Sequence, residues 1–269
     1  MLIDTHCHMN MMVKTQFDTS MQYDEYPLIR NIIDEATANK VTKIINVGTS
    51  FIESNNCVEI AKKFENVYAS VGIHPNDLTS EWKNDLNKIQ NLIKNKQTNK
   101  IVAIGECGID FYRPGYDFQR QKDGFKAQIE LALENNLALI VHSRNAPEET
   151  LSSIEEFKGQ IKRGVIHCFS EDLNFAKKVI EWDFVIGIGG TITYPKNDIL
   201  RNVCKTVSLK NIVLETDAPF LPPQIIRGKQ NHPKYIKYIA EYLAELRNQS
   251  FDEIAQQTTE NVYRVFNLS

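Results

Sequence analysis

The sequence predicts a (β/α)8 TIM barrel, built as a single domain over residues 1–269. This prediction rests on two observations. Short apolar, β-rich runs alternate along the chain with longer amphipathic segments, which is the pattern of a parallel sheet with crossover helices. Eight such units fit within 269 residues, a length typical of one closed α/β barrel.

The expected strands are apolar runs with few polar interruptions, because a strand buried on both faces has no polar side. They lie at residues 2–6, 43–47, 67–73, 101–106, 138–142, 164–167, 184–188 and 212–215. Helical patterns separate them at residues 25–39, 52–64, 84–96, 118–136, 147–157, 173–181 and 197–207. Two more helices are expected after the last strand, at residues 234–247 and 251–266.

An open, doubly wound sheet would also alternate strands with helices. Its phosphate-binding fingerprint is missing, however. The nearest candidate, Gly187-Ile-Gly-Gly190, lacks the third glycine at the required spacing and is better explained as a tight strand end. The closed barrel is therefore the prediction.

Composition narrows the function classes. The net charge is −3, so no overall positive field attracts nucleic acid, and any such attraction must be local. Five cysteines without a C-x-x-C pair argue against a disulfide framework and favour a reducing, cytoplasmic location. We expect no membrane span, since apolar runs such as residues 137–141 are too short, and no cleaved signal peptide. Nothing indicates an obligate protein partner.

Ligand-type residues gather at the predicted strand ends. Five of the six histidines fall at or just beyond the C-terminal end of a strand, and two carboxylates do the same. In a β/α barrel these ends meet around one mouth, where active sites lie, so residues far apart in sequence converge. The seven residues are His6, His8, His74, His142, His167, Glu106 and Asp217.

The first strand ends in an H-x-H pair. Strand alternation turns His6 and His8 to one face, where both can bind one metal, and turns Cys7 to the other. Alone, such a pair is a weak motif. Asp4 is expected on the inward face, either orienting a ligand histidine from behind or serving as a polar residue in the barrel floor.

Glu106 ends an otherwise apolar strand, so its charge needs a cationic partner, either a metal or an arginine. The histidines at the next two strand ends, His142 and His167, favour the metal. Asp217 follows Glu215 by two residues, so both carboxylates can face inward, one ligating and the other positioning it.

Other chemically active residues are expected to be structural. Cys7, Cys107 and Cys168 are predicted to be small buried apolar fillers rather than ligands or nucleophiles, with the first and last turned towards the helices. His232 stands between Asn231, expected to cap a helix, and a proline suited to the first helical turn.

Taken together, the motifs resemble those of the TatD-type deoxyribonucleases. Seven of them run in order from residue 4 to residue 231, with Ile109 in place of the usual leucine, while residues 11–24 carry none. They are Asp-Thr-His-Cys-His (4–8), Gly-Ile-His-Pro (72–75), Gly-Glu-Cys-Gly-Ile-Asp-Phe (105–111), His-Ser-Arg (142–144), His-Cys-Phe-Ser (167–170), Glu-Thr-Asp-Ala-Pro-Phe-Leu (215–221) and Arg-Gly-Lys-x-Asn (227–231).

The resemblance implies an amidohydrolase-type TIM barrel with two divalent metal ions and magnesium-dependent DNase activity, in several members as a 3′-to-5′ exonuclease. It implies that His74 contacts substrate phosphate or the reaction centre. Nitrogen and oxygen ligands also admit Mn²⁺ and Zn²⁺. By position, the first metal would be held by His6, His8, Glu106 and Asp217, and the second by Glu106, His142 and His167, with Glu106 bridging.

A two-metal centre can activate water and stabilise both the attacking and leaving oxygens of phosphodiester hydrolysis. Asp217 is the candidate general base, with Glu106 and His74 as the other catalytic candidates. The expected substrate is single-stranded DNA or a 3′ end. Loop arginines either bind flanking phosphates or are plain surface residues: Arg113, Arg144 and Arg227. Loop aromatics either stack bases or pack the loops: Phe111, Tyr112, Phe169, Tyr194 and Phe220.

Two other functions stay open. One is a barrel metallohydrolase acting on another ester or amide, such as a small phosphoester, a lactone or an aminoacyl ester. Glu106 stands where many related barrels use a carboxylated lysine, which favours the nuclease-like branch. The other is an inactive metal-binding barrel, against which the complete ligand set argues.

Overall fold

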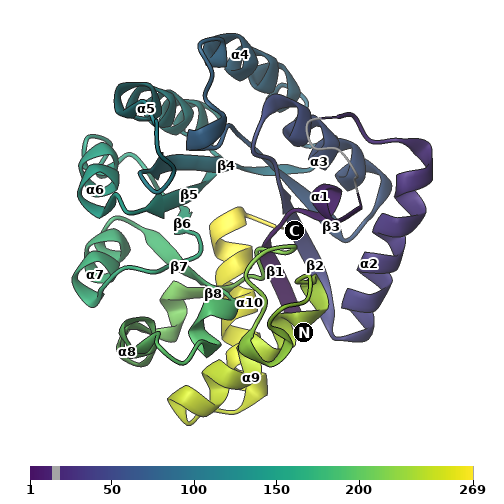
Figure 1. Ribbon diagram of the computed structural model, residues 1–269, viewed down its shortest axis with the longest axis vertical. Helices are drawn as coiled ribbons and strands as arrows, with labels where there is room; N and C mark the ends of the chain where they lie inside the picture. The colour runs from purple at the N-terminus through teal and green to yellow at the C-terminus, as the bar shows by residue number, and fades with distance from the viewer. Residues whose placement is uncertain (14–18, 269) are drawn as a thin grey trace.

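The structure, a computed structural model, describes residues 1–13 and 19–268. Eight parallel strands pair in chain order and curve into a barrel (Figure 1), and hydrogen bonds between β1 and the chain that follows β8 close it. The predicted (β/α)8 barrel is confirmed. The strands are β1 (Leu2–Cys7), β2 (Val41–Val47), β3 (Val67–Val71), β4 (Ile101–Asp110), β5 (Ala138–Arg144), β6 (Gly164–Ile166), β7 (Phe184–Ile188) and β8 (Ile212–Leu214).

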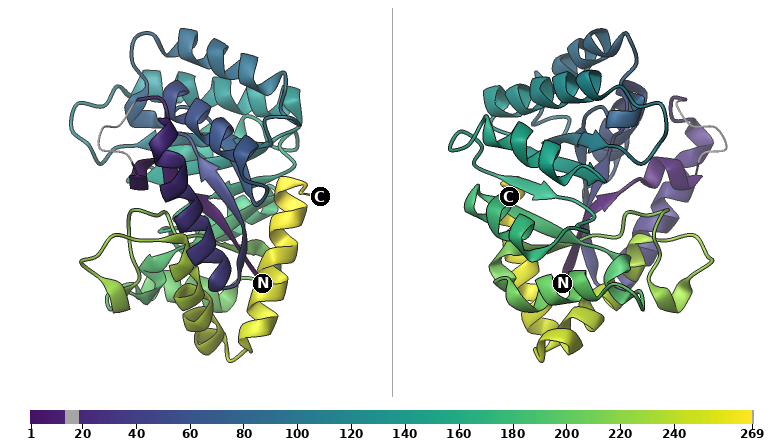
Figure 2. Two further views of the ribbon diagram at one scale, coloured as in Figure 1. Left: turned by 90° about the vertical axis from the view of Figure 1, so that its right-hand side faces the viewer. Right: turned by 60° about the vertical axis from the view of Figure 1, so that its left-hand side comes forward.

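The helices form a ring around the strands in Figure 1, and α10 lies at the end of the barrel near the N-terminus, as Figure 2 shows from the side. None of the helices in the described part of the chain is long and apolar enough to cross a membrane. They are α1 (Met9–Val13), α2 (Tyr26–Ala38), α3 (Phe51–Lys63), α4 (Trp82–Ile93), α5 (Phe118–Asn135), α6 (Pro147–Glu155), α7 (Leu173–Glu181), α8 (Asp198–Thr206), α9 (Ile236–Arg247) and α10 (Phe251–Phe266).

Short 3₁₀ turns occupy several loops, and the stretch at residues 11–24 is only partly described, since residues 14–18 lie outside the described chain. The turns are η1 (Tyr23–Glu25), η2 (Pro75–Asp77), η3 (Gly190–Thr193), η4 (Leu209–Asn211), η5 (Gln224–Ile226) and η6 (Pro233–Tyr235). The predicted tight strand end at residues 187–190 matches the end of β7 and the start of η3.

Side-chain caps define where the helices begin. Ser50, Asp117 and Asp172 each accept a hydrogen bond from a backbone N–H in the first turn of α3, α5 and α7. Ser250 and Glu253 form a capping box at the start of α10. The caps of α3, α5 and α7 end βα loops at defined residues and so help to hold the mouth of the barrel in place.

The barrel interior is a separate apolar core. Its residues come from the inward faces of the strands, and α10 closes it from below with Val262, Val265 and Phe266. A larger cluster fills the space between the strands and the surrounding helices. The inward strand residues are Ile3, Ile45, Val47, Ala103, Ala138, Ile140, Val165, Val185 and Val213.

Strand β1 does not follow strict alternation. Relative to β2 it carries one extra residue between Asp4 and Cys7, which is a β-bulge. Ile3 faces the inner core, and His6, three residues later rather than two, also faces inward. The expectation that Asp4 shares the inward face of His6 is therefore wrong.

Strand β4 carries a matching irregularity between Ile104 and Cys107 relative to β5. Glycines stand on both sides of Glu106 because the backbone there requires them. Gly105 and Gly108 have φ values of 146° and 145°, and a Cβ on Gly108 would lie 1.9 Å from a carbonyl oxygen of β5. The bulge turns Glu106 into the mouth of the barrel.

Barrel closure depends on the seam between β1 and the chain that follows β8. Asp217 N donates to His6 O at 2.8 Å, and His8 N donates to Ala218 O at 2.7 Å. The Asp4 carboxylate accepts hydrogen bonds from the backbone N–H groups of His6 and Thr216 and from Thr216 Oγ1 at 2.6 Å. Asp4 thus holds the two chains together through their backbones rather than orienting an imidazole.

We predict that Asp4→Ala lowers the free energy of unfolding by about 2–4 kcal/mol, because it leaves buried N–H donors at the seam without acceptors. Urea denaturation followed by circular dichroism measures the change. Asp34→Ala, on the exposed face of α2, is the control and should leave the midpoint unchanged. An unchanged midpoint for Asp4→Ala would show that the seam does not depend on this carboxylate.

Candidate metal centre

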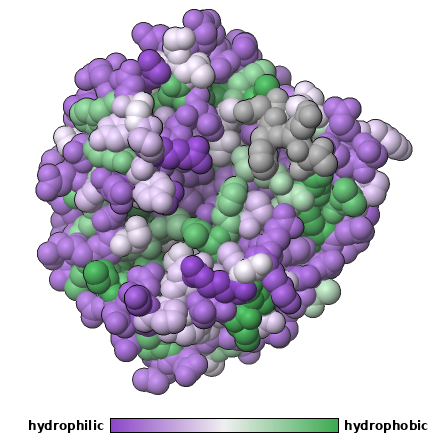
Figure 3. Space-filling view, in the orientation of Figure 1, coloured by the Kyte–Doolittle hydropathy of each residue, from purple (hydrophilic) through white to green (hydrophobic). Residues whose placement is uncertain are grey.

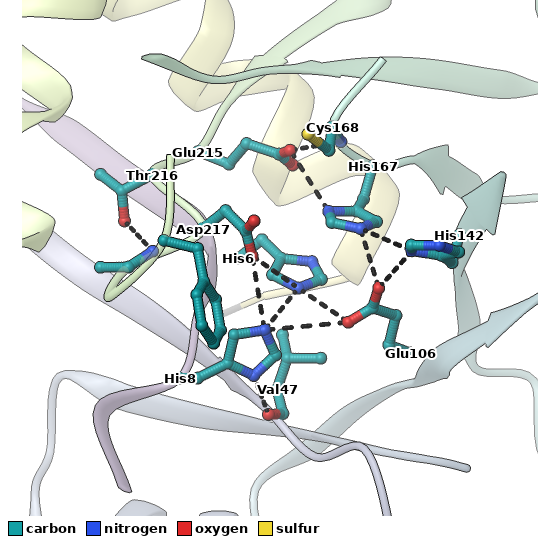
Figure 4. A network of polar contacts seen from close by, with 12 residues as sticks. His6, His8, Val47, Glu106, His142, His167, Cys168, Glu215, Thr216 and Asp217 are labelled. Atoms are coloured by element: carbon teal, nitrogen blue, oxygen red, sulfur yellow. Dashed lines mark hydrogen bonds and ion pairs between the residues drawn. The ribbon is translucent and has the colours of Figure 1, made fainter. Parts of the chain in front are cut away.

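The six residues predicted as ligands lie together at the C-terminal end of the barrel, with their polar groups turned towards one another (Figure 4). The face that carries them has a hollow near its centre in Figure 3. Inner-core residues lie two positions before His142 and His167, so alternation alone turns these two ligands inward. They are His6 and His8 at the end of β1, Glu106 on β4, His142 on β5, His167 after β6 and Asp217 after β8.

One set of atoms, from His6, His8 and Glu106 with Asp217 beside the histidines, has the spacing of a coordination shell. His6 Nε2 lies 3.1 Å from His8 Nε2 and 3.3 Å from Glu106 Oε2. Asp217 Oδ1 lies 3.4 Å from His8 Nε2 and 3.8 Å from His6 Nε2. Ligands about 2.1 Å from one ion at tetrahedral angles would be about 3.4 Å apart. His6, His8 and Glu106 therefore lie close enough to hold one divalent cation, and Asp217 Oδ1 lies beside the two histidines.

A second set shares the other oxygen of Glu106. Glu106 Oε1 lies 2.7 Å from His142 Nδ1 and 2.9 Å from His167 Nε2. The two nitrogens are 3.4 Å apart. The two oxygens of one carboxylate thus face two separate groups of nitrogens, which is the arrangement of a bridging ligand.

A hydrogen bond behind the His8 ring selects the tautomer that can bind a metal, and a carboxylate lies behind the His167 ring. His8 Nδ1 donates to Val47 O at 2.8 Å, which leaves the lone pair on Nε2, the atom that faces Glu106 and Asp217. His167 Nδ1 lies 3.5 Å from Glu215 Oε1, and its Nε2 faces the cluster. Glu215 is thus behind a ligand histidine, where it can position the ring.

His74 shows the opposite arrangement. Its Nδ1 accepts a hydrogen bond from Asn76 N at 3.1 Å, so the neutral ring carries its proton on Nε2. That Nε2 lies 3.6 Å from Glu106 Oε1. Burial, together with the nearby charge of His142, lowers the pKa of His74 to about 3, which keeps the ring neutral. His74 is therefore a hydrogen-bond donor aimed at the centre rather than a metal ligand.

The buried carboxylates of the centre need positive charge beside them to remain ionised. Burial alone would raise the pKa of Glu106, but the neighbouring histidines, first among them His167, hold it well below its usual value. Burial likewise opposes ionisation of Asp217, yet its bond with His8 lowers the pKa. In return Glu106 raises the pKa of His167 well above its usual value, although burial works against it. Protons or metal ions can supply the charge that these carboxylates require.

The loop that carries Asp217 is held in a strained conformation. Asp217 has a φ of 58°, which is uncommon outside glycine. Asn231 Nδ2 donates to Thr216 O and to Phe220 O, both at 2.7 Å, and so fastens the loop on either side of it. The prediction that Asn231 caps a helix is wrong, because the cap of η6 is His232 itself, whose Nδ1 accepts from a backbone N–H.

Two of the three predicted arginines are supported by tyrosine rings. The guanidinium carbon of Arg144 lies 3.6 Å from the ring centre of Tyr112, and that of Arg227 lies 4.4 Å from that of Tyr194. Arg113 instead lines a pocket of about 210 Å³ beside η2. All three arginines are exposed.

The loop aromatics divide into two groups. Phe169 is only 1% exposed and packs against Phe175, so of the two alternatives it packs the loop rather than stacking a base. Phe111 is half-buried in the outer core. Tyr112 and Phe220 are 59% and 48% exposed and remain accessible to a ligand.

The cysteines beside the ligands differ from one another. Cys7 and Cys107 are fully buried in the outer core, as predicted for apolar fillers. Cys168 is only partly buried, because it follows the end of β6 with a φ of 45° and alternation no longer applies. Burial raises the pKa of its thiol well above the usual value, so it stays protonated and is not a nucleophile.

Asp110 is a site residue that the sequence reasoning missed. It ends β4, is 1% exposed, and its Oδ2 lies 3.2 Å from His142 Nε2. Alternation counted from Glu106 places it on the inward face, and that count was the available signal.

Comparison with known proteins identifies close similarity over the whole chain. Residues 3–267 match the family described as TatD related DNase. The chain is 35% identical to the uncharacterized metal-dependent hydrolase YabD of Bacillus subtilis, over 100% of both chains. It is 31% identical to the uncharacterized metal-dependent hydrolase YcfH of Escherichia coli K12, over 99% of this chain and 96% of that one. The crystal structure of YjjV, a TatD homologue from E. coli, superposes with a TM-score of 0.89 at 30% identity, covering 100% of this chain and 98% of that one.

We predict that metal binding releases protons and weakens at low pH. The pKa values of His8, His142 and His167 are raised above 6.5, since the carboxylates outweigh the burial that would lower them. A histidine must lose its proton to bind a cation, so affinity is full above these raised pKa values and is lost as the pH falls through them.

Isothermal titration with Mn²⁺ at about pH 6 and about pH 8, in two buffers of different ionisation enthalpy, counts the protons released. Equal affinity at both pH values with no proton release would contradict the prediction.

Proposed function

The chain belongs to the family of TatD related DNases and is a metal-dependent hydrolase, and we propose that it hydrolyses the phosphodiester bonds of DNA with two divalent ions. Mg²⁺ is the proposed ion, and the proposed direction is 3′ to 5′ from a free end. One observation supports two ions: the two carboxylate oxygens of Glu106 face two separate groups of histidine nitrogens.

In this proposal one oxygen of Glu106 would join His6, His8 and Asp217 at the first site. The other oxygen would join His142 on β5 and His167 after β6 at the second. When bound, two such ions lower the pKa of water and offset charge on the phosphoryl oxygens. The chain itself must position the phosphate and move the proton.

Asp217 is the proposed general base. It is the most exposed of the carboxylates in the cluster, with 13% of its side chain exposed against 5% for Glu106, and so faces the side from which water and substrate arrive. The Nε2–H of His74 is the proposed donor to a phosphoryl oxygen, since its Nδ1 already accepts from the backbone. A neutral donor stabilises developing negative charge without occupying a metal position.

The depth of the site favours a flexible strand. His6 and His167 expose 0% and 4% of their side chains, so a scissile phosphate must enter between the loops to reach them. A single strand or a frayed 3′ end can do this, whereas a phosphate within a duplex cannot. Arg144 and Arg227, each supported by a tyrosine, are the proposed contacts for flanking phosphates. Cysteines that are all free, in the described residues, fit the proposed cytoplasmic location.

We predict that chelated protein does not cleave end-labelled DNA and that Mg²⁺ or Mn²⁺ restores cleavage. Glu106→Gln and Asp217→Asn should each lose activity by about 10³-fold or more while keeping the fold, since each removes an anionic oxygen at the reacting centre. Glu134→Gln, on the exposed side of α5, is the matched control. Cleavage after exhaustive chelation, or near-normal turnover by either site variant, would refute the proposal.

The same assay separates the substrates and the direction of cutting. A 3′ label should be released first as a mononucleotide, and single-stranded DNA should be cut faster than blunt duplex. A small phosphodiester, a lactone and an RNA strand tested beside it distinguish a nuclease from a hydrolase of another ester. Preference for the lactone would replace the DNA assignment.

A further prediction concerns Arg144. Arg144→Ala should raise KM for DNA by about 10-fold and reduce its dependence on salt, because one contact with phosphate is lost. Turnover of a small phosphodiester should be unchanged. Arg30→Ala is a matched control, since Arg30 also lies over an aromatic ring, that of Phe64, but belongs to α2. An equal KM for the two variants would argue against a phosphate contact at Arg144.

A further inference from the structure

Asp110, a residue outside the ligand set, is held in place by hydrogen bonds through both its side chain and its backbone. Its Oδ2 accepts from Asn76 Nδ2 at 2.9 Å, and its Oδ1 accepts from Tyr112 N at 2.7 Å. Gln121, reaching from α5, accepts from Asp110 N at 2.9 Å and donates to Asp110 O at 3.0 Å. The position of this carboxylate is therefore set by β4, η2 and α5 together.

The two ring nitrogens of His142 have different surroundings. Nε2 lies 3.2 Å from Asp110 Oδ2, and Nδ1 lies 2.7 Å from Glu106 Oε1 and 3.4 Å from His167 Nε2. A carboxylate accepts hydrogen bonds and, when ionised, donates none. Glu106, at the other nitrogen, is itself a candidate ligand, so a divalent ion held by Glu106 would take the place of a proton on Nδ1. Asp110 then keeps the remaining proton on Nε2, and the Nδ1 lone pair is directed at the ion.

We infer that Asp110 is a positioning residue that fixes the ring of His142 so that Nδ1 binds the second divalent ion. The inference rests on the metal centre of the proposed function but not on DNA as the substrate. A carboxylate behind a ligand histidine sets the ring orientation and raises its basicity, and its removal commonly weakens metal binding about 10–100-fold. His167 has the same arrangement, with Glu215 behind it.

A different role for Asp110 would be as a ligand, since Asp110, His74 and His142 lie close enough to hold an ion of their own. The tautomer of His74 argues against this. Its Nδ1 accepts from the backbone of Asn76, so its Nε2 carries a proton and has no lone pair for a metal. Asn76 thus holds both residues. Its backbone N–H donates to His74 Nδ1, and its side-chain amide donates to Asp110 Oδ2.

The test measures Mn²⁺ binding to the Asp110→Asn variant. Titration calorimetry gives the affinity of each ion, and electron paramagnetic resonance detects the bound ions. Asparagine has the size of aspartate but one acceptor oxygen, so it cannot satisfy Asn76, Tyr112 and His142 at once. We expect the second ion to bind about 10–100-fold more weakly, the first to bind as before, and the spin-coupled pair signal to disappear at limiting Mn²⁺.

Two controls accompany this variant. Asn76→Ala removes one bond to Asp110 but leaves its carboxylate against His142, so it should weaken the second ion less. Asp123→Asn, on the exposed side of α5, should change nothing. Nitrogen-15 NMR of histidine in the wild-type protein with Zn²⁺ tests the tautomer without any variant. A His142 that binds through Nε2 would overturn the inference, even if Asp110→Asn failed to fold.

The outcomes distinguish the inference from the proposed function. Two ions of unchanged affinity in Asp110→Asn would overturn the inference alone. Three ions in the wild-type chain and two in the variant would make Asp110 a ligand and also overturn it. Fewer than two ions in the wild-type chain would remove both the metal centre and the inference. If Asp110→Asn weakens binding of the second ion but the wild-type protein cleaves no DNA, the inference holds and the proposed DNA substrate is wrong.

Discussion

The buried carboxylate of Glu106 is the interaction on which the rest of the centre depends. It is 4% exposed and lies within 3.8 Å of nitrogens from five histidines, so it can be accommodated only where positive charge is supplied. The β4 bulge turns it inward, and the glycines at 105 and 108 allow the neighbouring strand to come close. The placement of Glu106 therefore depends on the glycines of β4, on the bulge that they permit and on the positive charge around the carboxylate.

On the other side of the centre, the backbone hydrogen bonds that close the barrel also set the positions of three candidate ligands. His6 and His8 come from the start of the chain, whereas Asp217 follows the last strand, and backbone bonds across the seam set their spacing. Asp4 and Thr216 stabilise that seam just beneath the ligands. Since three ligands of one proposed site span the closure, an ion bound there would also hold the barrel shut, as metal binding to a folded site stabilises the fold.

Periodicity predicted the elements and most of the cluster, and it failed where the backbone departs from regular strands. Alternation placed His142 and His167 correctly, because β5 and β6 are regular up to those residues. It misplaced Asp4 because a bulge has no signature in a hydrophobic pattern. It also misplaced Cys168, which lies beyond the strand end with a positive φ. The role of Asn231 depends on a tertiary contact with the β8 loop that no local pattern contains.

Charge balance gives an independent reason to expect a pair of divalent ions rather than one. Four carboxylates, Glu106, Asp110, Glu215 and Asp217, lie against the histidine rings, and each carries one formal negative charge when ionised. Two divalent cations match them with every histidine neutral and free to act as a ligand or a donor. With a single cation, two further positive charges would be needed for the same balance, and a histidine protonated on both nitrogens cannot bind a metal. The charge of the cluster therefore supports the proposed pair of ions, and the carboxylates behind the rings contribute to that charge as fully as the one between them.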